Sequence, residues 1–149
     1  MQPASLVFCE RTGRWAAAWR TVWARAAPEM ADRPLRIVET RSARECRETL
    51  AGTLTAFVAI ELTPEGADIA LDLLAQVTTS FPPSAAAVLA ENTLADYEWL
   101  ARELGAVHFI ASPRQLPSLT GIVCRHAAHT PAMEMGLRES VWSRLPWST

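Results

Sequence analysis

Short apolar runs alternate with segments of helical periodicity along most of this chain, and this alternation limits the possible folds more than any other feature. Apolar runs without alternating polar residues are typical of strands buried on both faces of a parallel sheet. The predicted strands cover residues 6–9, 35–38, 54–60, 86–90 and 107–110. Crossovers of this length place helices on both faces of such a sheet. The pattern predicts an α/β fold, a three-layer sandwich of five βα units.

Residues that favour helix ends delimit the predicted helices. Residues 42–45 (Ser-Ala-Arg-Glu) and 93–96 (Thr-Leu-Ala-Asp) read as capping boxes of the second and fourth helices. Thr63-Pro64 offers the third helix an N-cap and a proline at the first helical position. The expected stops are Pro28 after a first helix at 13–27, Gly52, Gly105, and Pro131 after a fifth helix at 118–129.

Composition and length limit the classes of function. The 149 residues predict one domain, residues 1–130, followed by a tail at 131–149. A net charge of −2 gives no electrostatic argument for binding nucleic acid or an anionic membrane. No apolar run approaches the ~20 residues of a membrane span, and no basic segment precedes an apolar stretch at the N-terminus. We therefore expect a cytoplasmic protein.

Two features of residue usage restrict the chemistry. All 14 basic residues are Arg, so no side-chain amine is present for a Schiff base, and a Walker-type phosphate loop, which uses Lys, is excluded. The cysteines, Cys9, Cys46 and Cys124, are odd in number and lack CxxC spacing. This pattern predicts free thiols in a reducing compartment.

The ends of four predicted strands carry Glu10-Arg11, Glu61, Ala90-Glu91 and Ser112-Pro113. With five βα units over residues 5–130, the chain resembles the receiver domain of response regulators. The resemblance implies a flavodoxin-like sheet of order 2-1-3-4-5, with a site at the carboxyl ends of the strands, where the strand order reverses.

The family's phosphorylation site is degenerate in this sequence. The acidic pair that holds Mg²⁺ falls at Glu10 and Arg11, and the phosphate-accepting Asp falls at Glu61. The Lys that precedes a conserved Pro falls at Ser112, before Pro113. An Arg beside Glu10 opposes Mg²⁺ binding, and the cation that stabilises the acyl phosphate is missing. The resemblance thus implies a non-catalytic pseudo-receiver with neither a metal nor another cofactor.

Glutamates stand at four predicted strand ends, Glu10, Glu39, Glu61 and Glu91. One interpretation is an acidic mouth that binds a cation or an Arg-bearing partner. The other is a set of solvated residues that begin loops, with Glu39 on an edge strand. The sequence leaves both open.

Six tryptophans fall into three groups. Trp15, Trp19 and Trp23 follow one face of the first helix, which predicts mostly core positions. On the fourth helix, Leu94, Tyr97, Leu100, Ala101 and Leu104 share the predicted core face. Trp99 lies opposite, beside Arg102, as a candidate partner-binding residue unless the tail or a loop covers it.

The tail contains Trp142, Leu145 and Trp147, with arginines between them. This composition favours docking, either on the chain's own domain or on a partner, over disorder. The candidate partner is a protein, which includes a second copy of this chain.

The histidines indicate packing more than metal binding. His126 and His129 are one turn apart near Cys124, but a zinc site would need further ligands. His126 falls between apolar neighbours, and His108 lies in a predicted strand. Both are expected to pack in the core.

Cys9 supports an alternative function. Its position at the end of the first strand resembles the nucleophilic cysteine of phosphotransferase IIB components and of small phosphatases. Arg14 stands one residue early for the phosphatase loop, and Glu10 is expected to repel phosphate and raise the pKa of the thiol. A cysteine-dependent phosphoryl-transfer enzyme stays the alternative, and the thiol pKa would discriminate between the two.

Overall fold

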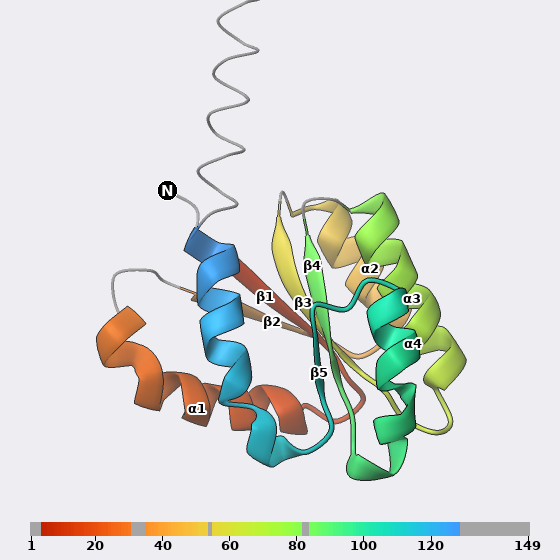
Figure 1. The fold of residues 1–149 in the computed structure, drawn as a ribbon. Helices are drawn as coiled ribbons and strands as arrows, with labels where there is room; N and C mark the ends of the chain where they lie inside the picture. Colours follow the sequence, from red (N-terminus) through yellow and green to blue (C-terminus); the bar gives the residue numbers. More distant parts are fainter. Residues whose placement is uncertain (1–3, 31–34, 54, 82–83, 129–149) are drawn as a thin grey trace, which may run out of the picture.

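The strands form one parallel sheet. The computed structural model describes residues 4–30, 35–53, 55–81 and 84–128. Its strands are β1 (Ala4–Cys9), β2 (Leu35–Thr40), β3 (Ala56–Glu61), β4 (Ala85–Leu89) and β5 (His108–Ile110). The sheet order is β2-β1-β3-β4-β5, with every neighbouring pair parallel (Figure 1). The predicted α/β architecture and strand order are therefore confirmed.

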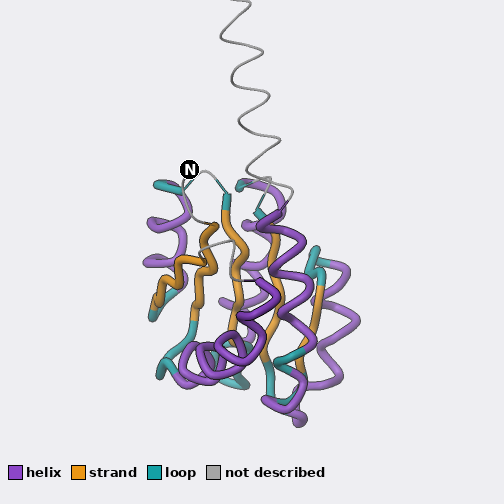
Figure 2. Tube along the Cα trace, turned by 90° about the vertical axis from the view of Figure 1, so that its left-hand side faces the viewer, coloured by secondary structure: helices purple, strands orange, loops and turns teal. Residues whose placement is uncertain are grey.

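Helices cover both faces of the sheet. They are α1 (Arg14–Met30), α2 (Ala43–Ala51), α3 (Ala67–Ser80), the 3-10 helix η1 (Asn92–Tyr97), α4 (Glu98–Glu103), the 3-10 helix η2 (Pro113–Gln115) and a last helix at 118–128. Figure 1 shows α1 and the last helix on one face, and α2, α3 and α4 on the other. Figure 2 shows the strands side by side, with loops and turns at their two ends.

The core consists of two clusters, one on each face, because successive strand residues point to opposite faces. Along β1, Leu6 and Phe8 belong to the cluster beneath α1, whereas Val7 belongs to the cluster beneath α2 and α3. The central strand β3 divides in the same way, and five of its six residues are buried. A parallel strand covered on both faces has no solvent side, which explains its unbroken apolar sequence.

The tryptophan stripe of α1 supplies much of the cluster on its face. Trp15 and Trp19 are buried, and Trp23 is partly buried against the same cluster. The rings of Trp19 and Trp23 stack with centroids 5.5 Å apart. The predicted core role of this stripe is confirmed.

Several predicted helix ends were correct. Ser42 caps α2 by accepting a hydrogen bond from the Glu45 N–H at 3.1 Å, and Gly52 is its C-cap. The Glu45 carboxylate accepts from the N–H of Arg41, one residue before the donor that a capping box would use. Gly105 follows α4 with φ of +107°, a conformation that favours glycine.

Three predicted ends were wrong. α1 continues through Pro28 to Met30, because a proline near a helix end removes only one main-chain hydrogen bond. α3 begins at Ala67, because Thr63 instead caps a preceding turn by accepting from the Gly66 N–H at 3.0 Å. The predicted capping residue Thr93 lies inside η1, so it does not stand at a helix start.

The η1 segment also changes which side chains α4 exposes. Leu94 and Ala101 are buried as predicted, but Leu100 is 38% exposed. A 3-10 helix turns about 120° per residue and an α-helix about 100°, so a single helical wheel over 94–104 places Leu100 wrongly. Trp99 is 73% exposed, as its position on the wheel predicted.

The tail from 131 to 149, with Trp142, Leu145 and Trp147, lies outside the described residues, as does His129. Within the described ranges, no helix combines the length and the apolar character that crossing a membrane would require.

Candidate functional site

The carboxyl ends of β1 and β3 form the centre of the candidate site, where Glu10 stands directly after β1. Glu10 is only 3% exposed. Its two carboxylate oxygens accept hydrogen bonds from the N–H groups of Trp15 and Ala16, each at 2.8 Å. A carboxylate at a helix N-terminus satisfies unpaired main-chain donors and interacts favourably with the helix dipole. Glu10 therefore caps α1.

Glu61 ends β3 and contacts α1 and the loop before it. Its carboxylate accepts from the indole N–H of Trp15 at 3.0 Å and from the Arg11 N–H at 3.3 Å. The Arg14 guanidinium lies 3.5 Å from the same carboxylate. Glu61 thus has a cation and two N–H donors from its own chain.

Arginines of the chain also contact the other two glutamates. Arg14 forms a second ion pair, with Glu91, at 2.9 Å. The carboxylate of Glu91, and after it that of Glu61, raises the pKa of Arg14. Glu39 on the edge strand pairs with Arg41 at 2.9 Å and with Arg20 at 3.1 Å. These hydrogen bonds, first that of Arg41, lower the pKa of Glu39.

The four glutamates of the predicted acidic mouth are therefore not free carboxylates. The glutamates do gather at the strand ends, but each described one is bound by groups of this chain. The cation beside Glu61 is Arg14, which reaches the carboxylate from the first turn of α1. The sequence indicated Arg14 as part of a phosphatase-like loop after Cys9 and did not predict its ion pairs with Glu61 and Glu91.

Ser112 and Pro113, which the resemblance places at the lysine position of receiver domains, follow β5. Ser112 has extended backbone and caps η2 by accepting from the Arg114 N–H at 3.3 Å. Pro113 is the first residue of η2. Both residues serve local structure, and Ala90 at the corresponding end of β4 is buried.

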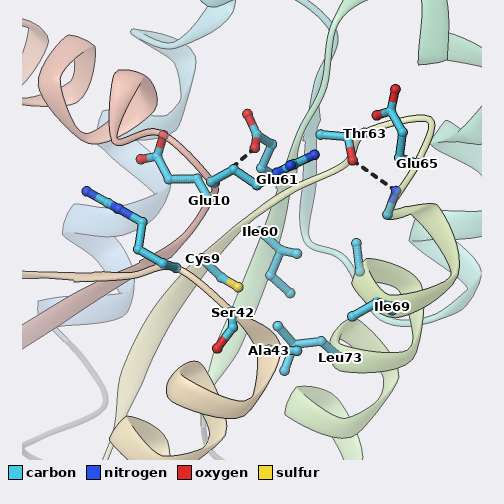
Figure 3. Close-up of a pocket in the computed structure, with 14 residues that line it drawn as sticks. Cys9, Glu10, Ser42, Ala43, Ile60, Glu61, Thr63, Glu65, Ile69 and Leu73 are labelled. Atoms are coloured by element: carbon cyan, nitrogen blue, oxygen red, sulfur yellow. Dashed lines mark hydrogen bonds between the residues drawn. The ribbon is translucent and has the colours of Figure 1, made fainter.

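A pocket of about 320 Å³ opens beside Glu61 and between the ends of β1 and β3 and the starts of α2 and α3 (Figure 3). Its lining includes a mainly apolar set: Cys9, Ala43, Ile60, Ile69, Ala70 and Leu73. Its polar lining includes Arg11, Arg41, Ser42, Glu61, Thr63 and Glu65. The pocket thus combines apolar side chains with groups of both charges.

Cys9 lies in the lining of this pocket and is half-buried. Hydrogen bonds, first from the Cys46 thiol and then from Thr40, lower the pKa of Cys9 although burial opposes this. The interaction with Cys9, and after it burial, raises the pKa of Cys46. The expectation that Glu10 raises the pKa of Cys9 was wrong, because the Glu10 carboxylate is turned to the α1 N-terminus.

The candidate partner-binding residues lie apart from this site. Trp99 is exposed on α4, and Arg102 pairs with Glu98 on the same helix at 2.9 Å. Val107, just before β5, is another exposed apolar side chain, at 47%. The structure therefore places an exposed Trp next to a charged pair.

The two described histidines pack differently. The ring of His126 contacts Phe57 edge-on, with centroids 5.6 Å apart, in agreement with the expected packing role. His108 is half-buried and forms a hydrogen bond with Ser118 at 2.8 Å. Burial, and secondarily Arg102, lower its pKa. Among the residues that the structure describes, no group of three or more metal-binding side chains is placed to hold an ion.

Comparison by sequence finds no matching family model and no similar curated protein.

Comparison by structure finds response regulators. A response regulator from Thermotoga maritima superposes with a TM-score of 0.68 at 16% identity, covering 85% of this chain and 99% of that one. A CheY-like receiver domain protein from Methanospirillum hungatei superposes with a TM-score of 0.61 at 15% identity, covering 84% of this chain and 94% of that one. This chain therefore has the fold of a response-regulator receiver domain.

Proposed function

We propose that this chain is a non-catalytic receiver domain that works through protein contacts and independently of phosphorylation. The observation that carries the proposal is the state of its two central carboxylates. Glu10 caps α1 through two main-chain bonds, and Glu61 is held by Arg14 and the Trp15 indole. Mg²⁺ binding or phosphoryl transfer at either carboxylate would compete with these partners.

Charge also opposes phosphoryl transfer at this site. Mg²⁺ requires several oxygen ligands in a near-octahedral arrangement, and here Arg14 lies 3.5 Å from Glu61. The Ser112 side chain is already used as a cap and carries no charge to stabilise an acyl phosphate. A role through contacts needs none of these groups.

Labelling with acetyl phosphate tests phosphorylation independence. The full chain is incubated with acetyl phosphate and Mg²⁺, and phosphorylation is followed by phosphate-affinity electrophoresis and intact mass. An active receiver domain treated in parallel is the positive control. We expect no stoichiometric labelling. Labelling at Glu61 or at any Asp would contradict the proposal.

Trp99 supports the protein-contact part of the proposal. Trp is frequent among residues that dominate binding energy, and an indole that is 73% exposed is unusual on a monomer surface. Leu100 on the same helix adds further exposed apolar area. The candidate partner is a second copy of this chain or another protein, and Trp142, Leu145 and Trp147 of the tail are proposed to take part.

Sedimentation of the full chain over a range of concentrations tests the self-association arm. We expect a concentration-dependent dimer that Trp99→Ala weakens and Arg44→Ala does not, since Arg44 is an exposed residue of α2. A chain ending before Pro131 reports the contribution of the tail. A wild-type chain that stays monomeric would reject the homodimer. Dimerisation that is insensitive to Trp99→Ala would reject Trp99 as its contact.

A cysteine-dependent phosphoryl-transfer enzyme is the second candidate, because Cys9 faces a pocket and its pKa is lowered. A phosphate cradle needs free main-chain N–H groups after the cysteine. Here the N–H of Arg11 bonds to Glu61, and those of Trp15 and Ala16 bond to Glu10. Cys9-dependent hydrolysis of p-nitrophenyl phosphate, lost in Cys9→Ser, would favour the enzyme. We expect no such activity.

A further inference from the structure

The pocket beside Glu61 has an apolar end and a polar end (Figure 3). The apolar end is formed by side chains from β1, β3, α2 and α3: Cys9, Ile60, Ala43 and Leu73. The polar end is formed by the end of β3 and the loop that follows it: Glu61, Thr63 and Glu65. A volume of about 320 Å³ and a mainly apolar lining with a few polar groups are typical of sites that bind small molecules.

Most of the charged side chains in the lining already have partners. The lining contains five of them: Glu10, Arg11, Arg41, Glu61 and Glu65. Groups of α1 and of the loop before it bind Glu10 and Glu61, and Arg41 pairs with Glu39. These three side chains are therefore satisfied within the chain.

Arg11 and Glu65 are the charged side chains that remain available to a ligand. Both residues are exposed, and within the described part of the chain neither forms an ion pair. The N–H of Arg11 bonds to Glu61, which places Arg11 at the polar end of the pocket. Glu65 lies at the same end (Figure 3). One positive and one negative side chain thus stand beside an apolar cavity.

We propose that this pocket binds a free α-amino acid with an apolar side chain. The side chain of the ligand occupies the apolar end, between Cys9 and Leu73. Its carboxylate faces the guanidinium of Arg11, and its ammonium group faces the carboxylate of Glu65. Such a ligand supplies an apolar body and two opposite charges, which are the three features that the pocket leaves without a partner.

The two available charges decide the class of ligand. A ligand with a carboxylate alone would leave Glu65 without a partner and would approach a second carboxylate, that of Glu61. A ligand with an amine alone would leave Arg11 without a partner. Ile69, which also lines the pocket, is 64% exposed, so a bound apolar side chain would cover part of it. The binding depends neither on the proposed lack of phosphorylation nor on Trp99.

Titrations of the full ¹⁵N-labelled chain, followed by NMR up to millimolar ligand, test the proposal. The probes are L-leucine and L-phenylalanine. Three further compounds each lack one feature: 4-methylpentanoate has no ammonium group, isopentylamine has no carboxylate, and L-serine has no apolar side chain. We expect leucine or phenylalanine to shift the amides of pocket residues such as Gly66 and Ile69. Each of the three incomplete compounds should bind roughly tenfold more weakly, or less well still, because a hydrogen bond between charged groups contributes on that order.

Charge-neutral variants assign the two ends of the ligand. Arg11→Gln should weaken leucine binding but leave the weak binding of isopentylamine unchanged. Glu65→Gln should weaken leucine binding but not that of 4-methylpentanoate. Both residues are exposed, so both variants are expected to fold. Arg44→Gln and Glu103→Gln are the matched controls, because these exposed residues of α2 and α4 do not line the pocket, and they should bind leucine like the wild type.

Alkylation of the cysteines gives a second measurement. Leucine should slow the reaction of Cys9 with iodoacetamide, because Cys9 lines the pocket. Cys124, which is partly buried on the last helix and does not line the pocket, is the internal comparison and should react at an unchanged rate.

Three results would overturn the proposal. The first is that neither leucine nor phenylalanine shifts the amides around the pocket. The second is that 4-methylpentanoate or isopentylamine binds as well as leucine, which would show that the pocket does not recognise both charges. The third is leucine binding that neither Arg11→Gln nor Glu65→Gln weakens.

Discussion

The indole N–H of Trp15 donates a hydrogen bond to the Glu61 carboxylate at 3.0 Å and thereby joins the first turn of α1 to the end of β3. Trp15 is itself buried, with 1% of its surface exposed. The bond thus gives Glu61 a structural role at the carboxyl end of β3. The same carboxylate also contacts the loop before α1 through the Arg11 N–H.

Removal of the Glu61 carboxylate is expected to destabilise the fold. Glu61→Ala leaves the buried Trp15 N–H without its acceptor, which costs about 1–3 kcal/mol of unfolding free energy. Glu61→Gln keeps an acceptor oxygen and should cost less. Urea unfolding followed by tryptophan fluorescence measures both. The control is Glu48→Ala, which removes an exposed ion pair with Arg44 and should change stability by less than ~1 kcal/mol. Equal effects of Glu61→Ala and Glu48→Ala would refute the structural role.

Glu10 is expected to matter through capping. Glu10→Ala removes the acceptor of two main-chain N–H groups at the start of α1, and we expect a loss of about 1–3 kcal/mol. Glu10→Gln retains one acceptor oxygen and should be intermediate. Chemical denaturation gives the free energies, and amide hydrogen exchange at Trp15 and Ala16 gives the local effect. Unchanged protection of these two amides in Glu10→Ala would contradict the capping role.

Two glycines should respond oppositely to the same substitution. Gly105 has φ of +107°, and an added Cβ would lie 2.4 Å from the Thr78 side chain. Gly105→Ala should therefore destabilise the fold by at least ~1 kcal/mol. Gly121 lies in the last helix with nothing within 4 Å of such a Cβ, so Gly121→Ala should stabilise by about 0.5–1 kcal/mol. Thermal and urea unfolding of both variants check the signs, and a stabilised Gly105→Ala would show that the local geometry is wrong.

His108 should make stability depend on pH near neutrality. Burial lowers its pKa in the folded state, so the unfolded chain binds more protons as the pH falls below about 6.5. Unfolding free energy should therefore decrease on acidification through that value and level off for this group below its folded-state pKa. The slope should be shallow because His108 is only half-buried. His108→Gln should flatten the profile between about pH 5 and 7, where few carboxylates titrate. Identical profiles would refute the effect.

Local patterns predicted the elements of this fold well. The apolar strands follow from burial on both faces, and the tryptophan spacing of α1 follows from helical periodicity, so both were visible in the sequence. The cap at Ser42 was visible because donor and acceptor are three residues apart. The prediction of buried residues failed at Leu100. The preceding 3-10 helix η1 turns more per residue than an α-helix, so Leu100 points toward solvent.

The sequence predicted the residues of the candidate site but not their contacts. Glu10, Glu61 and Ser112 could be identified as candidate site residues from the sequence through the resemblance to receiver domains. Their partners could not, because Trp15 and Glu61 are 46 residues apart and meet only when β1 and β3 pair. The packing of Cys9 against the core cluster that includes Cys46 depends in the same way on how α2 packs against β1.

The sequence by itself determined the α/β class, the strand positions, the core face of α1 and the absence of lysine from the chain. Only the tertiary structure decided that Arg14 forms ion pairs with Glu61 and Glu91, that Glu10 caps a helix and that Cys9 lines a pocket. The physical reason is the range of the interactions. Periodicity and capping act over a few residues, whereas these ion pairs and long-range hydrogen bonds require side chains that the parallel sheet brings together from distant segments.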